Sequence, residues 1–187
     1  PTRHGDNGVV RGVSAEDMFY YFIPKCKVTG SLKLKKEKIE IQSATGWYDH
    51  EFGCHPPEKE GAKDEAKKDV SWNWIAMQLE NGCELTAYDL IDLKTGEDCG
   101  SFIIMIDEKG KRHYSKKFHL KPIGELWTST RTFNEYPTSW QLEAPEFGLK
   151  IKAEAAFPNQ EFATVISKPA FWEGRMNISG TLKSKKV

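Results

Sequence analysis

The stretch Thr45-Gly46-Trp47-Tyr48-Asp49-His50-Glu51-Phe52-Gly53 places aromatic side chains, two carboxylates and one imidazole between two glycines. The residues before it alternate in character. Apolar Val28, Leu32 and Leu34 lie at even spacing, with Lys27, Lys33 and Lys35 between them. After a turn at 35–37, Ile39 and Ile41 alternate with Lys38, Glu40 and Gln42. A period of two is typical of half-buried strands. The pattern therefore predicts a hairpin with one wet face that leads into Trp47 to Phe52.

The rest of the chain has the same character. Residues 18–23, 70–79, 83–91, 99–106 and 149–155 form further β-prone runs, and Asn81-Gly82 predicts a type I′ turn between two of them. Nine or ten strands are expected, with turn signals between most neighbours. This spacing favours an all-β, antiparallel barrel or sandwich with less than one fifth helix.

Two segments lack periodicity. Residues 1–17 are polar with three glycines, and we interpret them as a segment that joins domains or crosses the edge of a sheet. Residues 55–69 are dominated by Lys, Glu, Asp and Ala, which predicts a charged surface loop; a lid beside the central stretch is the functional alternative. The domain is then expected to span residues 18–187.

Composition limits the partners. The chain has 187 residues, with 27 Lys plus Arg and 27 Asp plus Glu. Zero formal charge argues against nucleic acid or an anionic membrane as the main partner. No apolar run is long enough to cross a bilayer. Four cysteines without a Cys-x-x-Cys pair, and the sequon Asn177-Ile178-Ser179, weakly favour a secretory or extracellular location over four buried thiols in the cytosol.

Candidate chemistry centres on two carboxylates and a histidine. Asp49 and His50 lie among large apolar neighbours, which suits proton transfer with water held back; the structural alternative is a strand end that enters a surface loop. Asp89 lies in line with the apolar residues of 83–91, where an unpaired carboxylate is costly, while Tyr88 points the other way. We expect Asp49, His50 and Asp89 to face one cavity bordered by Trp47 and by Trp72 or Trp74.

The sequence lacks the motifs of several standard enzyme chemistries. The sequence has no glycine-rich phosphate loop, no Gly-x-Ser-x-Gly elbow and no His-Glu-x-x-His pair. Asp49, His50 and His55 are a weak metal signal, and we predict no metal. Most of the six tryptophans are expected in the core, and two or three could line an apolar cavity and stabilise a carbocation.

Four pieces of sequence carry a resemblance. They are Tyr20-Tyr21 with Gly30, Gly46 to Gly53, Trp72-Asn73-Trp74 with Asn81-Gly82, and Phe171-Trp172-Glu173-Gly174 with Gly180. Together they resemble the carotenoid hydratase family of lipocalin-like proteins. The family includes kievitone hydratase-like fungal proteins, and relatives guide Diels–Alder and hetero-Diels–Alder cyclisations. The pieces span nearly the whole chain, but Phe52 stands where the family's Asp-His-x-Trp pattern ends in Trp.

The resemblance implies two lipocalin-like β-domains side by side, and this chain is similar to the second of them. It also implies a hydrophobic terpenoid or polyketide ligand, no cofactor, and an upstream β-domain of the same protein as partner. We predict catalytic roles for Asp49, His50, Asp89 and Tyr88. We predict that the ligand is bound by Trp47, Phe52, Trp72, Trp74 and Trp172.

Three functions are compatible with these residues and this resemblance. Hydration of an alkene needs an acid that stays protonated near neutral pH, so its pKa must be raised by apolar surroundings. A pericyclase must fold its substrate and donate a hydrogen bond to a carbonyl. A lipocalin-like barrel without catalysis would carry an apolar ligand.

Overall fold

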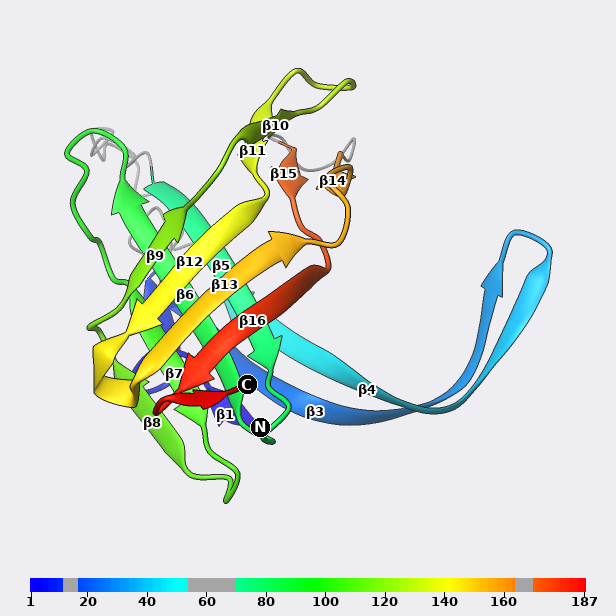
Figure 1. Cartoon of the computed structure of the whole chain (residues 1–187), viewed down its shortest axis with the longest axis horizontal. Helices are drawn as coiled ribbons and strands as arrows, with labels where there is room; N and C mark the ends of the chain where they lie inside the picture. Colours follow the sequence, from blue (N-terminus) through cyan, green and yellow to red (C-terminus); the bar gives the residue numbers. More distant parts are fainter. Residues whose placement is uncertain (12–16, 54–69, 164–169) are drawn as a thin grey trace, which may run out of the picture. The chain divides into compact units, whose positions relative to one another are not determined.

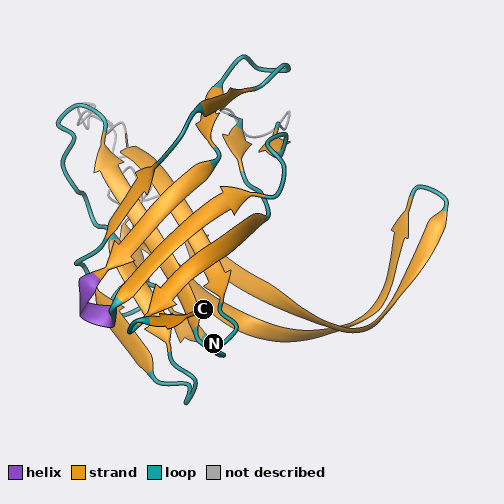
Figure 2. Cartoon of the chain, in the orientation of Figure 1, coloured by secondary structure: helices purple, strands orange, loops and turns teal. Residues whose placement is uncertain are grey.

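The computed structural model describes residues 1–11, 17–53, 70–163 and 170–187. The expected loop at 55–69 and Cys54 lie outside this part. Contacts divide the chain into two compact units, Pro1–Tyr114 and Ser115–Val187. The described residues form antiparallel strands and no α-helix, which confirms the predicted all-β class (Figures 1 and 2). None of their helices is long and apolar enough to cross a bilayer.

The first unit contains two four-stranded sheets. One has the order β1-β3-β2 with β4 on the other edge of β3, and the second has the order β5-β6-β7-β8. The strand bounds are β1 Thr2–Arg3, β2 Val9–Arg11, β3 Asp17–Leu34, β4 Glu37–Gly53, β5 Val70–Gln78, β6 Glu84–Asp92, β7 Phe102–Ile106 and β8 Arg112–Ser115.

Strands β3 and β4 form one long hairpin, drawn blue to cyan in Figure 1. Its turn at Lys35-Lys36 lies where the sequence predicts it. Pro24 cannot donate a backbone hydrogen bond, and the pairing register shifts between Ile23 and Cys26. The proline therefore falls where the strand is irregular and does not end it.

Residues expected to join domains are partly paired as strands. Thr2–Arg3 and Val9–Arg11 form the edge strands β1 and β2 on β3. Between them, His4 N donates to Tyr20 O and Gly8 N donates to His4 O. The β-prone Thr2, Val9 and Val10 were too short a signal to predict strands from periodicity.

The hairpin at Asn81-Gly82 is confirmed, but its predicted type I′ turn is wrong. A type I′ turn needs positive φ at both central residues. Here Gly82 has φ +85°, whereas Asn81 does not have positive φ. Glu80, Asn81 and Gly82 form a three-residue loop in which Leu79 N donates to Cys83 O, and Asn81 accepts from Cys83 N through its side chain.

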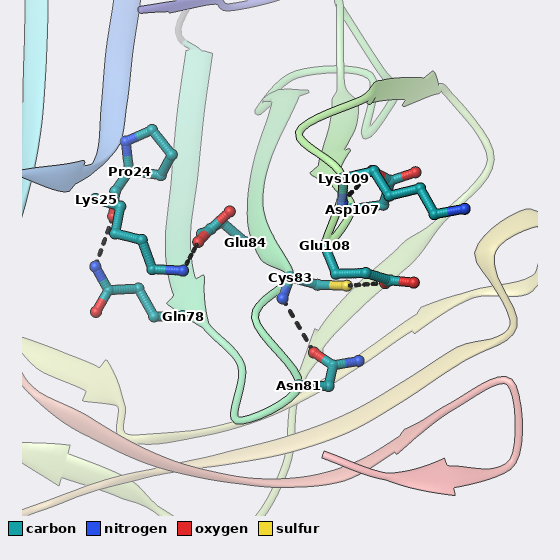
Figure 3. A network of polar contacts seen from close by, with 9 residues as sticks. All are labelled: Pro24, Lys25, Gln78, Asn81, Cys83, Glu84, Asp107, Glu108 and Lys109. Carbon is teal, nitrogen blue, oxygen red and sulfur yellow. Dashed lines mark hydrogen bonds and ion pairs between the residues drawn. The ribbon is translucent and has the colours of Figure 1, made fainter.

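Polar contacts connect the bulge of β3 to the second sheet (Figure 3). Gln78 Nε2 donates to Pro24 O at 2.6 Å, and Lys25 Nζ lies 2.8 Å from Glu84 Oε1. Nearby, the Cys83 thiol donates to Glu108 Oε2 at 3.6 Å, and burial together with this carboxylate raises the pKa of Cys83. Cys26 and Cys83 form no disulfide with any described residue.

The core of the first unit lies between its sheets. Its buried members are Val10, Tyr20, Phe22, Phe102, Ile104 and Ile106, and Trp47, Tyr88 and Tyr114 pack against them. Inward residues thus come from β2, β3, β4, β6, β7 and β8. This cluster forms one wall of the candidate site described below.

The second unit is a five-stranded sheet with two small hairpins. The sheet order is β17-β16-β13-β12-β9, and β10 pairs with β11 and β14 with β15. The bounds are β9 His119–Pro122, β10 Leu126–Thr128, β11 Glu135–Pro137, β12 Ser139–Ala144, the 3-10 helix η1 Pro145–Phe147, β13 Leu149–Ala155, β14 Glu161–Phe162, β15 Phe171–Trp172, β16 Met176–Leu182 and β17 Lys185–Lys186.

Two features fix the second unit locally. A Cβ on Gly180 would lie 2.1 Å from the Lys150 carbonyl oxygen, so glycine is needed for the approach of β16 to β13. Glu161 accepts hydrogen bonds from the hydroxyls of Ser129, Thr132 and Tyr136. Partial burial opposes ionisation of Glu161, but these donors lower its pKa below the ordinary value.

Candidate functional site

Strand β4 presents two faces of different chemistry. Asp49 is opposite Phe22 in the register and Glu51 is opposite Tyr20, and both partners are buried in the core. Side chains alternate along a strand, so Trp47, Asp49 and Glu51 share the inner face. The Trp47 ring stacks on Phe22 with centroids 5.0 Å apart. Both carboxylates therefore stand on the face of the hairpin that contributes Tyr20 and Phe22 to the core.

Strands β5 and β6 contribute aromatic residues to the same interior. Tyr88 stacks on Phe102 at 5.7 Å, and its ring lies 6.4 Å from His4. Trp74 is the cross-strand partner of Tyr88, and Trp72 is the partner of Leu90. Cross-strand partners project from the same side of a sheet, so both tryptophans lie on the inner face.

This interior is accessible on one side. Tyr20, Phe22 and Phe102 are at most 8% exposed, whereas Trp72 is 50% exposed and Trp47, Asp49 and Trp74 are partly exposed. Among the described strands, β4 and β5 are sheet edges that do not pair with each other. The inner face is thus partly exposed at Trp47, Asp49, Trp72 and Trp74. We define the inner site by the residues that gather there: His4, Trp47, Asp49, Glu51, Trp74 and Tyr88.

His4 is the most enclosed member of the inner site. It is 0% exposed, its ring stacks on Tyr20 at 3.8 Å, and its Nε2 lies 3.6 Å from Asp49 Oδ1. That separation is longer than a hydrogen bond. Burial lowers the pKa of His4, although the neighbouring Asp49 acts in the opposite direction. His4 is therefore a neutral imidazole held beside a carboxylate.

Buried polar atoms without a partner concentrate in this unit. In a folded protein, few buried polar atoms lack a hydrogen bond. Among the described residues, the atoms that do are both ring nitrogens of His4, Trp47 Nε1, Asp49 Oδ1, Trp74 Nε1, Thr86 Oγ1 and Arg112 Nε. Four of these residues belong to the inner site. Two indole N–H donors and a carboxylate oxygen are thus left for water or a ligand.

The carboxylates and tyrosines perturb one another. Glu51 is largely exposed, yet partial burial of its carboxyl and the charge of Asp49 raise its pKa. Burial and the charges of Glu51 and Asp49 raise the pKa of Tyr88 to about 12. Burial and the same carboxylates also raise the pKa of Tyr20. Both phenols therefore stay protonated, and the site holds a carboxyl group with an increased affinity for protons.

The structure separates the three side chains that we expected to converge. His50 lies on the outer face of β4, is exposed, and its Nδ1 is 3.0 Å from the Tyr21 hydroxyl. Asp89 lies on the face of β6 opposite to Tyr88, where Asn73 donates to Oδ2 at 3.1 Å and Ser101 donates to Oδ1 at 3.4 Å. Asp89 lies in line with apolar residues, but these hydrogen bonds satisfy its carboxylate. Of the three, Asp49 alone reaches the inner face.

The expected ligand-binding aromatics also divide. Trp47, Trp72 and Trp74 lie on the inner face, as described above. Phe52 lies on the outer face of β4 and is 48% exposed. Trp172 belongs to the second unit, where its Nε1 donates to Pro158 O at 2.7 Å. A Cβ on Gly174 would lie 2.5 Å from Gln160, which accepts from Arg175 N, so this motif has a local structural role.

Sequence reasoning missed His4 and Glu51 as members of the inner site, and Tyr20 as part of the wall beside it. Tyr20 and Glu51 belong to the motifs that carry the family resemblance, and strict alternation from Asp49 would have placed Glu51 on the same face. No signal in the sequence singles out His4. Among the described residues, no group of three or more His, Cys, Asp or Glu is arranged to hold a metal ion, and His55 lies outside that part.

Comparison with known proteins agrees with this fold. A family model described as AttH-like matches residues 1–186, so the chain belongs to the AttH-like family. A putative AttH of Nitrosomonas europaea superposes with a TM-score of 0.75 at 21% identity, covering 99% of this chain and 55% of that one. Kievitone hydratase of Nectria haematococca superposes with a TM-score of 0.79 at 20% identity, covering 99% and 54%.

These likenesses show the fold. The chain spans about half the length of the solved structures that it matches, as the covered shares of 55% and 54% indicate. No curated protein matches the sequence. Membership of the AttH-like family is thus shown, and the predicted all-β, lipocalin-like fold class is confirmed.

Proposed function

We propose that the inner site is the acid–base centre of a hydratase-like enzyme that acts on a hydrophobic small molecule. The observation that carries this proposal is the pair Asp49 and Glu51 on one aromatic face, with the pKa of Glu51 raised. A carboxyl group with a raised pKa can donate a proton near neutral pH. The fold shared with kievitone hydratase supports the reaction class.

In the proposed reaction, the Glu51 carboxyl transfers its proton to one carbon of an alkene, and the π electrons form the new C–H bond. The resulting carbocation lies near indole faces, which stabilise a cation. Water adds to the cation, Asp49 takes the proton that this water loses, and an alcohol results. Proton exchange between the two carboxyl groups restores the starting state. Tyr88, which stays protonated, orients the ligand.

The substrate is proposed to be a hydrophobic terpenoid or polyketide, and kievitone is a further candidate because the similar hydratase is named for it. The inner tryptophans supply apolar surface, and no cofactor takes part. Incubation of the whole protein with kievitone and with candidate terpenoids and polyketides, followed by mass spectrometry, tests this function. A product that has gained one water supports hydration. Unchanged substrate in every case, with ligand bound at the inner site, would instead support a carrier.

A pericyclase is the second candidate, and the unpaired Nε1–H groups of Trp47 and Trp74 favour it. An indole N–H that donates to a substrate carbonyl withdraws electron density and accelerates a Diels–Alder or hetero-Diels–Alder step. Such a product has the mass of the substrate and new rings. The incubation above therefore separates the two reactions.

A further β-domain is proposed as the partner of this chain. The arm formed by residues 29–35 and 37–44 of the β3–β4 hairpin exposes Leu32, Leu34 and Ile39 by 43% to 53%. A two-stranded ribbon is only marginally stable in water by itself. A second β-domain that covers the apolar side of this arm would remove the exposed surface.

A further inference from the structure

Five aromatic rings form a continuous ladder on the outer face of β3 and β4. Phe19 stacks on Phe52 at 5.6 Å, Phe52 lies 5.0 Å from His50, and His50 lies 5.3 Å from Tyr21. Tyr21 lies 6.2 Å from Tyr48. We define the aromatic ladder as these residues: Phe19, Tyr21, Tyr48, His50 and Phe52. Because side chains alternate along β4, the ladder lies on the face opposite to the inner site.

The ladder is exposed. Phe19 and Phe52 are each 48% exposed, and Tyr48 is 44% exposed. Single exposed apolar residues are ordinary, but contiguous ones mark surfaces that bind something. The Tyr21 hydroxyl and His50 Nδ1, 3.0 Å apart, fix two of the rings. The ladder is thus an ordered aromatic surface.

A groove of about 700 Å³ runs from the ladder to the loop between β1 and β2. This volume is within the range of small-molecule sites. Its lining includes Arg3, Asn7, Phe19, Tyr21, Ile23 and Phe52. Gly8 also lines it, and a Cβ there would lie 3.3 Å from three carbons of the Arg3 side chain. The glycine therefore leaves room for the Arg3 stem to lie along the loop.

Arg3 is the charged side chain among the described lining residues of the groove. These residues include no Asp or Glu, and Arg3 is exposed and forms no ion pair with any described residue. Asn7 Oδ1 already accepts from Val9 N at 3.0 Å. Its amide N–H₂ is then the remaining polar group of that side chain. The groove offers a guanidinium and an amide donor beside an aromatic floor.

We propose that this groove binds a planar aromatic anion, such as an aryl carboxylate. The ring of the ligand stacks on Phe19 and Phe52, and its carboxylate pairs with Arg3. Offset stacking suits ring separations of the kind seen within the ladder, and the guanidinium fork matches a carboxylate. The proposal does not depend on the function of the inner site, because the two lie on opposite faces of β4.

Isothermal titration with 2-naphthoate and with neutral 2-naphthalenemethanol tests the proposal. We expect 2-naphthoate to bind more tightly, with an affinity that falls as salt rises. Arg3→Gln should weaken 2-naphthoate binding about fivefold or more and leave the alcohol within about twofold. Phe52→Ala should weaken both probes. Lys33→Gln, which removes an exposed cation from the arm of β3, is the matched control and should change neither.

Three results would overturn the proposal. Equal affinity for the two probes would show that charge is not recognised. Unchanged 2-naphthoate binding in Arg3→Gln would show that Arg3 does not pair with the carboxylate of the ligand. Loss of binding in Asp49→Asn, with Phe52→Ala unaffected, would place the probe at the inner site. Circular dichroism and sizing of each variant confirm that folding and association are unaltered, because a second copy seated on the ladder would also block the groove.

Discussion

The Nε2 atom of His4 lies 3.6 Å from Oδ1 of Asp49, and neither atom has a hydrogen-bond partner among the described residues. His4 is followed by a loop between two short edge strands, whereas Asp49 lies within the long strand β4. The β1–β3 pairing brings them together, because it places Thr2 and Arg3 opposite Phe22 and Tyr21. Because these atoms are buried and unpaired, protonation of His4 is expected to change the stability of the folded protein.

Acidification is expected to destabilise the protein through His4. Burial lowers the folded-state pKa of His4 from the ordinary 6.5, so the unfolded chain binds the proton more tightly. The stability associated with neutral His4 is present above about pH 6.5 and is lost as pH falls below it. Thermal unfolding midpoints between about pH 5 and 8 measure this dependence.

His4→Phe should flatten that pH profile, while His119→Gln, at an exposed histidine of β9, should leave it unchanged. An identical slope in wild type and His4→Phe would contradict the assignment.

Glu51 should have the opposite effect on stability. Its folded-state pKa is raised above the ordinary 4.5, so the folded chain binds the proton more tightly than the unfolded chain. Stability therefore decreases as pH rises through the window that begins at about 4.5. Glu51→Gln removes this loss, so its unfolding free energy relative to wild type should rise with pH in urea denaturation. Glu37→Gln, at the far end of β4, is the control, and an equal rise there would refute the prediction.

Catalytic activity should separate the two faces of β4. If Glu51 donates the proton and Asp49 accepts one, Glu51→Gln and Asp49→Asn should each lower kcat about 100-fold or more with the fold intact. His50→Gln and Asp89→Asn change residues that the structure places elsewhere, and each should change kcat by less than about threefold. If His50→Gln and Asp89→Asn lowered kcat more than Glu51→Gln and Asp49→Asn, the catalytic residues would be His50 and Asp89, and the inner site would have no catalytic role.

The alternation of apolar and polar residues predicted where strands lie and which way their side chains point, because both depend on local sequence. A period of two predicts the hairpin of β3 and β4 and the opposite directions of Asp89 and Tyr88. The loop at Asn81-Gly82 follows instead from its turn residues. The period of two also separates Asp49 from His50, which are adjacent in sequence and hence on opposite faces. Asp49 and His50 therefore do not converge, because neighbouring residues of one strand point to opposite faces of its sheet.

His4 could not be predicted for a different reason. Its burial depends on pairing between a two-residue strand and a partner about twenty residues away, and such a short strand has no periodicity. A hydrogen bond that satisfies Asp89 also depends on tertiary structure, since its donor Ser101 immediately precedes the neighbouring strand β7. Sequence patterns identify which face a residue takes, but contacts between strands decide which carboxylate remains unpaired.

The exposed arm of the β3–β4 hairpin is expected to control association. Leu32 and Leu34 are 47% and 53% exposed, so replacing both by Lys removes apolar surface from water without opening a core. The double variant should stay monomeric at concentrations where the wild-type chain self-associates in sizing experiments. Lys33→Gln is the control on the same strand. A wild-type chain that is already monomeric and highly soluble would count against the proposed β-domain partner.

The indole N–H groups of Trp47 and Trp74 should distinguish a ligand site from an ordinary core. A buried donor without a partner is unfavourable, so Trp47→Phe and Trp74→Phe, which keep an aromatic ring, should cost little stability beyond the lost area. If the donors bind a substrate oxygen, each variant should lower kcat/KM about tenfold or more for a carbonyl-bearing substrate. The corresponding Ala variants also lose the ring and should be worse for every substrate. Activity that is equal in wild type and both Phe variants, but lost in the Ala variants, would mean that the tryptophans act through shape alone and would leave no role for the N–H groups.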